Sequence, residues 1–108
     1  MRYRNGNVYE GEWKAGMKEG RGVFRFAAAG DVYDGEWAAG AIEGYGVKRY
    51  ASGNVYSGEW KGGEKEGRGV WRWADGSVYY DGEWKAGEPV DDDLPLSLPS
   101  SSGLTMFI

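Results

Sequence analysis

Large aromatic residues alternate with polar residues in a short string that recurs four times along the chain. The string is Tyr-x-Gly-Glu-Trp, in which x is Glu, Asp or Ser. A period of two is the period of a β-strand, whose successive side chains point to opposite faces. Each string therefore predicts a strand with Tyr, Gly and Trp on one face and the acidic residues on the other. The four strings occupy residues 9–13, 33–37, 56–60 and 80–84.

The residues that follow each string also recur, so that the sequence consists of units of 23 or 24 residues. A Gly stands three residues after the Trp and predicts a three-residue hairpin loop in which this Gly has positive φ. A Gly-x-Gly and a Val come next and open a second alternating strand, which a turn glycine such as Gly53 closes. Each unit thus predicts one β-hairpin. The complete units are about 9–32, 33–55 and 56–79, with a partial unit at 1–8 and a half-unit at 80–88.

Stacking of the hairpins determines the predicted fold. A single β-hairpin cannot bury its own face, but a row of three or more can. We therefore predict an all-β protein: an elongated, single-layer antiparallel sheet of stacked β-hairpins, twisted and grooved. Recurrent glycines let aromatic rings of neighbouring strands lie over bare backbone. The extra residue in the doublet Tyr79-Tyr80 predicts a β-bulge or a slightly longer turn where that strand begins.

The composition removes several kinds of chemistry. The 108 residues include 20 Gly, 6 Trp and 8 Tyr, but no Cys and no His. Without Cys and His there is no disulfide, thiol nucleophile, imidazole metal ligand or Ser-His-Asp triad. The Gly-x-Gly motifs are not phosphate-binding loops, because no helix is predicted after them and no Gly-Lys-Ser/Thr occurs. We therefore expect a protein that is not an enzyme and that binds no cofactor and no metal.

The charge distribution argues against nucleic acid as a partner. The formal net charge is −4, and Asp91, Asp92 and Asp93 account for most of it, so that residues 1–90 are nearly neutral. A nearly neutral body does not attract nucleic acid. No stretch approaches the roughly 18 apolar residues of a membrane span, and no apolar run follows the N-terminus as in a secretory signal. We expect an intracellular protein, in the cytoplasm or associated with the cytoskeleton or a membrane.

The full motif, Tyr-x-Gly-Glu-Trp-x-x-Gly-x-x-x-Gly-x-Gly, resembles the MORN repeat (membrane occupation and recognition nexus) over residues 9–88. The resemblance implies an extended hairpin array with a groove lined by the aromatic rings of the motif. It also implies an interaction or scaffold module, of the kind found in cytoskeletal, flagellar and contractile assemblies, that holds a helical or extended segment of a partner. The chain departs from the family pattern after Gly-x-Gly-Val, where a small aliphatic residue is usual and this sequence has Phe24, Lys48 and Trp71.

The aromatic residues have two compatible interpretations. They can stack on one another and on glycine as a core, and they can also line a binding groove, because a one-layer sheet leaves part of such a surface open. The sequence does not fix whether the second strands present their rings on the same face as the Tyr/Trp series. Trp71 and Trp73 are the strongest candidates for hot spots. The candidate partner-binding residues are Trp71, Trp73, Phe24, Phe26, Tyr50, Tyr9, Trp13, Tyr33, Trp37, Tyr56, Trp60 and Trp84.

The charged repeat positions are interpreted as cross-strand ion pairs on the polar face, not as catalytic carboxylates. A second set of basic residues supports an alternative function, a peripheral membrane tether that binds acidic phospholipid headgroups. Polybasic lipid-binding patches usually lack interleaved acids, which disfavours this alternative. The expected ion pairs join Glu12, Glu36, Glu59 and Glu83 with Arg25, Arg49 and Arg72. The basic residues of the alternative are Lys61, Lys65, Arg68 and Lys85.

The sequence changes character at Pro89, where an acidic triplet is followed by alternating leucines and an apolar end. This tail, residues 91–108, is interpreted either as a disordered end or as a segment that packs as a cap, on the groove or on an open sheet edge. The partner predicted by the whole sequence is a protein helix or an extended peptide. Self-association through the sheet edges or the tail is the further alternative.

Overall fold

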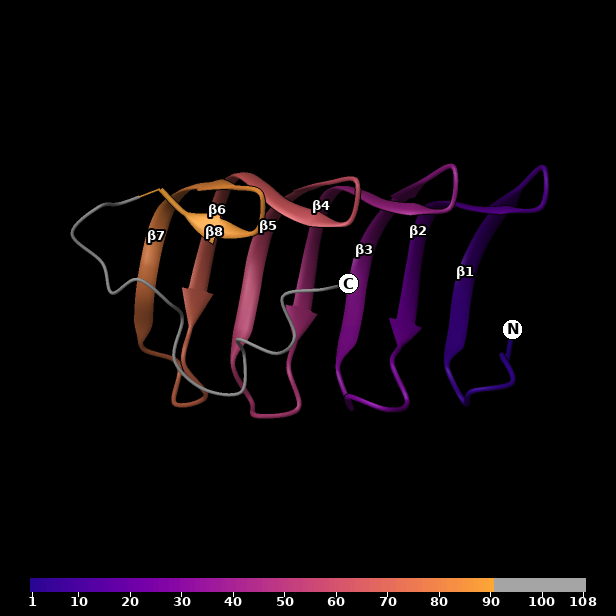
Figure 1. The fold of residues 1–108 in the computed structure, drawn as a ribbon, viewed down its shortest axis with the longest axis horizontal. Helices are drawn as coiled ribbons and strands as arrows, with labels where there is room; N and C mark the ends of the chain where they lie inside the picture. The colour runs from indigo at the N-terminus through magenta and orange to yellow at the C-terminus, as the bar shows by residue number, and fades with distance from the viewer. Residues whose placement is uncertain (91–108) are drawn as a thin grey trace.

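The computed structural model describes residues 1–90, which form one antiparallel sheet of eight β-strands in chain order (Figure 1). The predicted all-β fold with a single open sheet is confirmed. The predictions for the tail lie outside the described residues. Within residues 1–90 there is no helix that is long and apolar enough to cross a bilayer. The strands are β1 (Val8–Lys14), β2 (Met17–Arg25), β3 (Val32–Ala38), β4 (Ala41–Arg49), β5 (Val55–Lys61), β6 (Glu64–Arg72), β7 (Val78–Lys85) and β8 (Glu88–Pro89).

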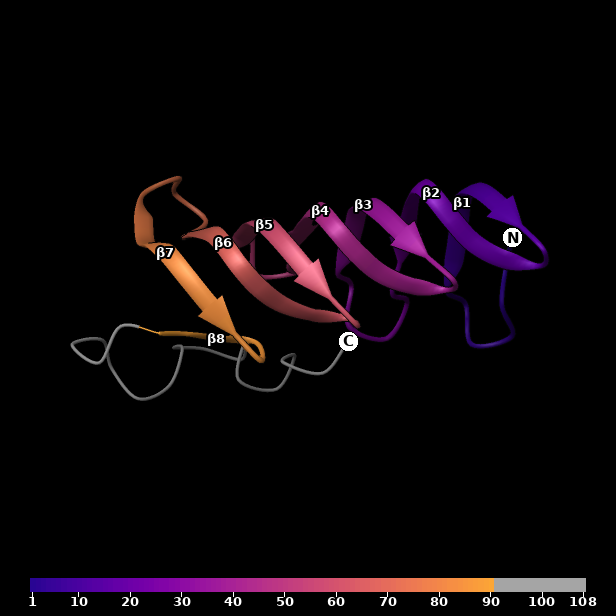
Figure 2. The ribbon, with the colours of Figure 1, turned by 90° about the horizontal axis from the view of Figure 1, so that it is seen from above.

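The sheet is long, narrow and curved. Its extents are 43 × 24 × 20 Å, with the row of strands along the longest axis. The strands bend towards their hairpin turns, and the view from above shows β2, β4 and β6 sweeping across the array in parallel curves (Figure 2). Curvature of this kind gives the single layer an inner and an outer face.

The hairpin turns contain two residues and not the three predicted. Lys14 pairs with Met17, so that the loop of the first hairpin is Ala15-Gly16. Both loop residues have positive φ, 52° at Ala15 and 80° at Gly16. Two consecutive positive φ angles define a type I′ turn, whose twist matches that of the flanking strands. The prediction of positive φ at the glycine is confirmed, but the preceding alanine shares that conformation.

The Tyr79-Tyr80 doublet forms the predicted bulge. Tyr80 pairs with Trp71 and Val78 pairs with Arg72, which leaves Tyr79 as the extra residue between them. A second type of bulge, which the sequence did not predict, recurs in the second strand of each complete hairpin, opposite the motif glutamate. Gly11 pairs with Gly22 and Trp13 pairs with Lys18, so that Glu12 of β1 alone lies opposite residues 19–21 of β2.

The strand register shows on which face the second strand of each hairpin presents its aromatic rings, a point that the sequence left open. Phe24 of β2 lies opposite Tyr9 on one side and opposite Tyr33 on the other. Paired residues in an antiparallel sheet share a face, so that the second strands add their rings to the Tyr/Trp series. We call this side the aromatic face and the opposite side the polar face. The buried hydrophobic residues, all on the aromatic face, are Tyr9, Phe24, Trp37, Ile42, Tyr33, Tyr50, Tyr56, Trp60, Trp71 and Trp84.

Candidate functional site: the aromatic face

Tyrosines and tryptophans alternate along the aromatic face in edge-to-face contacts. The ring of Tyr33 meets Trp37 of its own hairpin and Trp60 of the next, with 5.4 Å between ring centroids in both contacts. Their planes cross at 88° and 84°. This is the geometry in which the electropositive edge of one ring meets the electronegative face of another, worth about 0.5–1.5 kcal/mol beyond area burial. Tyr9 and Tyr56 are placed in the same way.

Two repeated hydrogen bonds fix these rings. The hydroxyl of Tyr33 donates to the carbonyl of Glu36 over 2.9 Å, at the place where the register between β3 and β4 shifts. The indole N–H of Trp37 donates to the carbonyl of Gly22 in the preceding repeat over 3.1 Å. Trp60 and Trp84 make the same bond to Gly46 and Gly69. Each repeat after the first is therefore bonded through its tryptophan to the repeat before it.

The glycines of the motif make room for the tyrosine rings, as predicted. A Cβ atom on Gly46 would overlap the ring of Tyr33, and one on Gly35 would meet the backbone of Gly46. The first glycine of each Gly-x-Gly has a different role, since Gly44 has φ +85°. The Tyr33 ring therefore occupies the space that a side chain at Gly46, the second glycine of the motif, would fill.

The candidate binding residues divide by exposure. Trp13 is 42 % exposed, and its indole N–H has no acceptor in residues 1–90 of the kind that Gly22 provides for Trp37. Phe26 and Trp73 are half-buried at the ends of the second strands. The other candidates, Trp71 included, are buried at 9 % exposure or less. Trp71 therefore has a core position, whereas Trp73, Phe26 and Trp13 combine packing with accessible surface.

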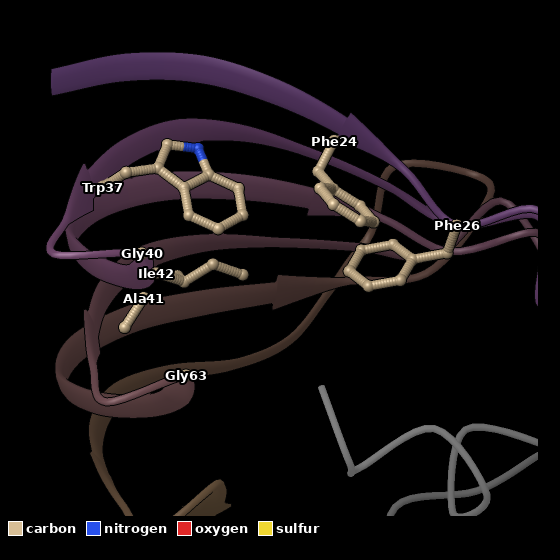
Figure 3. Close-up of a pocket in the computed structure, with 7 residues that line it drawn as sticks. All are labelled: Phe24, Phe26, Trp37, Gly40, Ala41, Ile42 and Gly63. Carbon is tan, nitrogen blue, oxygen red and sulfur yellow. The ribbon is translucent and has the colours of Figure 1, made fainter. Parts of the chain in front are cut away.

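An apolar hollow opens on the aromatic face between the first and second repeats (Figure 3). Its volume is about 220 Å³, and it is bounded by Trp37, Ile42 and two phenylalanines with small residues at the rim. Figure 3 shows the Trp37, Phe24 and Phe26 rings pointing to a common space inside the curved strands. The lining residues are Phe24, Phe26, Trp37, Gly40, Ala41, Ile42 and Gly63. The size suits one or two large apolar side chains of a bound segment.

The second repeat carries a buried ion pair where its neighbours are neutral. The Lys48 ammonium lies 3.8 Å from a carboxylate oxygen of Asp31, and both side chains are almost fully buried. Burial lowers the pKa of Lys48 to about 8, while the Asp31 charge opposes the shift. At the corresponding places the first repeat has Asn7 and Phe24. The other oxygen of Asp31 accepts from the Ala51 backbone N–H over 2.9 Å, as Asn7 does from Ala27 over 2.8 Å.

A second buried lysine lies among aromatic rings. Lys65 is 3 % exposed, and its ammonium is 5.6–5.9 Å from the ring centroids of Tyr50, Tyr56, Trp60, Trp71 and Trp84. Cations over aromatic faces gain about 2 kcal/mol or more when desolvated. Burial nevertheless lowers the pKa of Lys65 to about 7, with the Lys48 charge acting in the same direction. The sequence places Lys48 among the second-strand residues as a polar break in the aromatic surface, but it does not identify Lys65 as part of that face.

The polar face does not carry the predicted ion pairs. In the described sheet Arg25 and Arg49 lie opposite valines, and the pairs that form are Arg21–Asp34 and Arg68–Asp81 at 3.6 and 3.7 Å. Two of the motif glutamates instead bind backbone: Glu36 accepts from the Tyr45 N–H over 3.1 Å, and Glu59 accepts from the Arg68 N–H over 3.3 Å. The motif turns its carboxylates towards its own backbone because the Gly-x-Gly strand exposes N–H groups beside them.

The site and fold define an all-β repeat protein, in which similar hairpins pack on their neighbours around a continuous aromatic row. The MORN repeat family matches residues 9–28, 33–55, 56–78 and 80–90, which is most of the chain, and the protein belongs to that family. MORN repeats are in general modules for interaction with proteins or membranes. A search of curated proteins finds no match to this sequence.

Proposed function

We propose that this chain is a non-enzymatic protein-interaction module that binds a helix or an extended segment of a protein partner along its aromatic face. The hollow between the first two repeats carries the proposal. It is an apolar recess of about 220 Å³ on the inner side of a curved sheet, and its rim includes partly exposed Phe26. Recesses of this kind receive the aromatic or aliphatic anchors that dominate binding energy.

The membrane alternative receives less support from the side chains on which it depends. Lys65 is buried under aromatic rings, and Arg68 is paired with Asp81. Lys61 and Lys85 remain exposed, but two cations fall short of the four to eight that a polybasic lipid site typically contains. A protein partner is therefore the better supported alternative, and we propose an intracellular location because MORN proteins are typically intracellular.

A blocking substitution tests the proposal. Ala41→Arg places a long charged side chain at the rim of the hollow, whereas Ser57→Arg places the same group on the polar face. After cross-linking in cells, a protein that is captured by the wild type and by Ser57→Arg, but lost with Ala41→Arg, supports the proposal. Equal capture by both variants contradicts it. Salt-sensitive co-sedimentation of the wild type with acidic vesicles would favour the membrane tether instead.

A further inference from the structure

A half-buried lysine, Lys18, lies beside the apolar hollow of the aromatic face. Its carbonyl accepts a hydrogen bond over 3.0 Å from the backbone N–H of Gly40, which lines the hollow. Its ammonium nitrogen is 5.4 Å from the ring centroid of Phe24 and 5.5 Å from that of Trp37, and both rings also line the hollow. The two rings drawn in Figure 3 therefore lie between the lysine and the hollow and border on both.

The Lys18 ammonium is surrounded by aromatic rings but remains within reach of an incoming group. Ring faces attract a cation, but they carry no net charge and cannot serve as its counter-ion. The other two lysines of this face, Lys48 and Lys65, are 1 % and 3 % exposed and are closed to a ligand. Lys18 keeps part of its surface exposed. The five rings, whose centroids are 5.3–5.8 Å from its nitrogen, belong to Tyr3, Tyr9, Trp13, Phe24 and Trp37.

The charge on the aromatic face has one sign. Lys18, Lys48 and Lys65 each pair with an aromatic residue of the neighbouring strand, and no acidic residue occupies a paired strand position on this face within residues 1–90. The carboxylate of Asp31 lies close by but is paired with Lys48. The ion pairs between described residues do not include Lys18. A segment that docks on this face therefore meets positive charge, and charge complementarity favours a segment that is acidic.

The repeat gives the spacing between the lysine and the hollow. Lys18 pairs with Trp13 in the first hairpin as Ile42, at the hollow, pairs with Trp37 in the second. Equivalent positions of successive repeats are two strands apart, which is about 10 Å. An extended chain advances about 3.3 Å per residue. A segment that crosses the strands in extended form therefore reaches from the hollow to Lys18 in about three residues.

We propose that the partner segment carries an Asp or Glu about three residues from a large apolar anchor. The anchor fills the hollow, and the carboxylate pairs with the Lys18 ammonium. The surrounding rings hold the ammonium in place, so that forming the ion pair orders little that is not already ordered. This inference rests on the proposed function and specifies the chemistry of the partner.

Selection from random linear peptides displayed on phage tests this specificity on the full chain. The wild type is compared with Lys18→Ile, which copies Ile42 of the second repeat. The matched control is Lys14→Ala, which copies Ala38 and removes the same charge from the opposite face of the same hairpin. Folding of each variant is checked by circular dichroism. We expect the wild type and the control to select an acidic residue beside an aromatic or large aliphatic one, and Lys18→Ile to select the apolar residue alone.

Binding of a single selected peptide provides the second measurement. The peptide is compared by fluorescence anisotropy with its amide counterpart, in which Asn or Gln replaces the acidic residue. We expect the amide to bind the wild type about fivefold more weakly. On Lys18→Met, which keeps the apolar stem of the side chain, the two peptides should differ by less than roughly twofold. An equal difference on both proteins, or no difference on the wild type, overturns the ion pair.

The outcomes separate this inference from the proposed function. Peptides that bind the wild type and fail to bind Ala41→Arg, but show no preference for an acidic residue, overturn the Lys18 contact and leave the proposed function standing. If no selected peptide is lost with Ala41→Arg, both proposals are contradicted. Displacement of the peptide by phosphatidylserine vesicles, but not by phosphatidylcholine vesicles, on the wild type and not on Lys18→Met would assign Lys18 to a lipid headgroup and overturn its pairing with a partner carboxylate.

Discussion

Alanines in left-handed backbone positions are a local source of instability at the residue scale. Ala39 has φ 49° in the turn of the second hairpin, whereas the third hairpin has Gly62 with φ 57° at the same place. A left-handed conformation costs an L-residue about 1–2 kcal/mol. Replacing the residue with glycine removes this cost, but part of the gain is offset because glycine has more conformational freedom in the unfolded chain. The second and third hairpins therefore provide a matched pair, with Ala and Gly at the same left-handed turn position.

We expect Ala39→Gly to raise the free energy of unfolding by about 0.5–1 kcal/mol. The reverse change in the neighbouring hairpin, Gly62→Ala, should lower it by a similar amount. Urea unfolding followed by tryptophan fluorescence measures both. Changes of the same sign in the two variants would show that turn strain is not the cause.

The buried pair of Lys48 and Asp31 leads to a second prediction. Removing one partner leaves the other charge buried and should cost about 3–5 kcal/mol, whereas replacing both restores a neutral site. Lys48→Phe with Asp31→Asn recreates the combination of Phe24 and Asn7 in the first repeat. We expect each single variant to be strongly destabilised and the double variant to lie close to the wild type. Additive losses in thermal unfolding would contradict this coupling.

The same pair predicts a pH dependence. The pKa of Lys48 is about 8 in the folded protein, against an ordinary value of 10.5 in the unfolded chain. Between pH 8 and pH 10.5 the unfolded chain therefore binds more protons than the folded protein. Stability from this group therefore rises with pH above about 8 and is lost as the pH falls through that value. As the pH rises above 8, the free energy of unfolding of the wild type should increase, relative to that of the double variant, by up to about 1 kcal/mol per pH unit. Both proteins retain Lys65, so that their difference isolates the pair. A flat difference between pH 8 and about 9.5 would refute the prediction.

At the scale of the element, the hairpin depends on glycines that the tyrosine ring covers. Gly46→Ala would drive a methyl group into the Tyr33 ring, against which the sheet backbone cannot yield. We expect a loss of about 2–3 kcal/mol, at the upper end of overpacking costs. Gly82→Ala is the matched control, because its added methyl meets chiefly the hydroxyl end of Tyr80 at 2.7 Å, near the end of the array. A larger loss for Gly82→Ala in chemical unfolding would argue against the ring-over-glycine packing.

The hairpin is also the element that the sequence predicts best. Alternation in the Tyr-x-Gly-Glu-Trp strings and the recurrent glycines determine the strands, their order and the ring-over-glycine packing. The two-residue turn was missed because Ala15 gives no signal for positive φ. The bulge opposite Glu12 was missed because the Gly-x-Gly was interpreted as the start of a regular strand, whereas Gly20 has φ 70°. Lys65 was read as a surface cation, since its burial arises only when rings from three hairpins meet around it.

At the scale of the whole molecule, the tryptophan hydrogen bonds give the array a direction. Trp37 donates to Gly22 of the repeat before it, while the indole N–H of Trp13 makes no such bond within residues 1–90. Coupling through neighbours of this kind makes stability a sum of local interfaces, with the first hairpin the least supported.

Hydrogen exchange of the indole N–H groups measures this gradient. We expect Trp13 to exchange fastest, and Trp37, Trp60 and Trp84 to be protected. Trp37→Phe should increase exchange throughout β1 and β2 and leave β6 and β7 nearly unchanged, because it removes one junction only. Uniform exchange across the sheet would mean that the array opens as a single unit.

Because the hairpins are all connected in the same way, the number of repeats sets the length of the molecule. Each repeat contributes two strands, and neighbouring strands are about 4.8 Å apart, so that one duplicated unit of 23 residues would lengthen the sheet by close to 10 Å. Its own tryptophan would bond to the preceding Gly-x-Gly, and its own Gly-x-Gly would receive the next tryptophan, as at every present junction. Copying a unit therefore creates no mismatched boundary. The reach of such a protein can change in fixed steps during evolution, or by design, while both of its ends stay as they are.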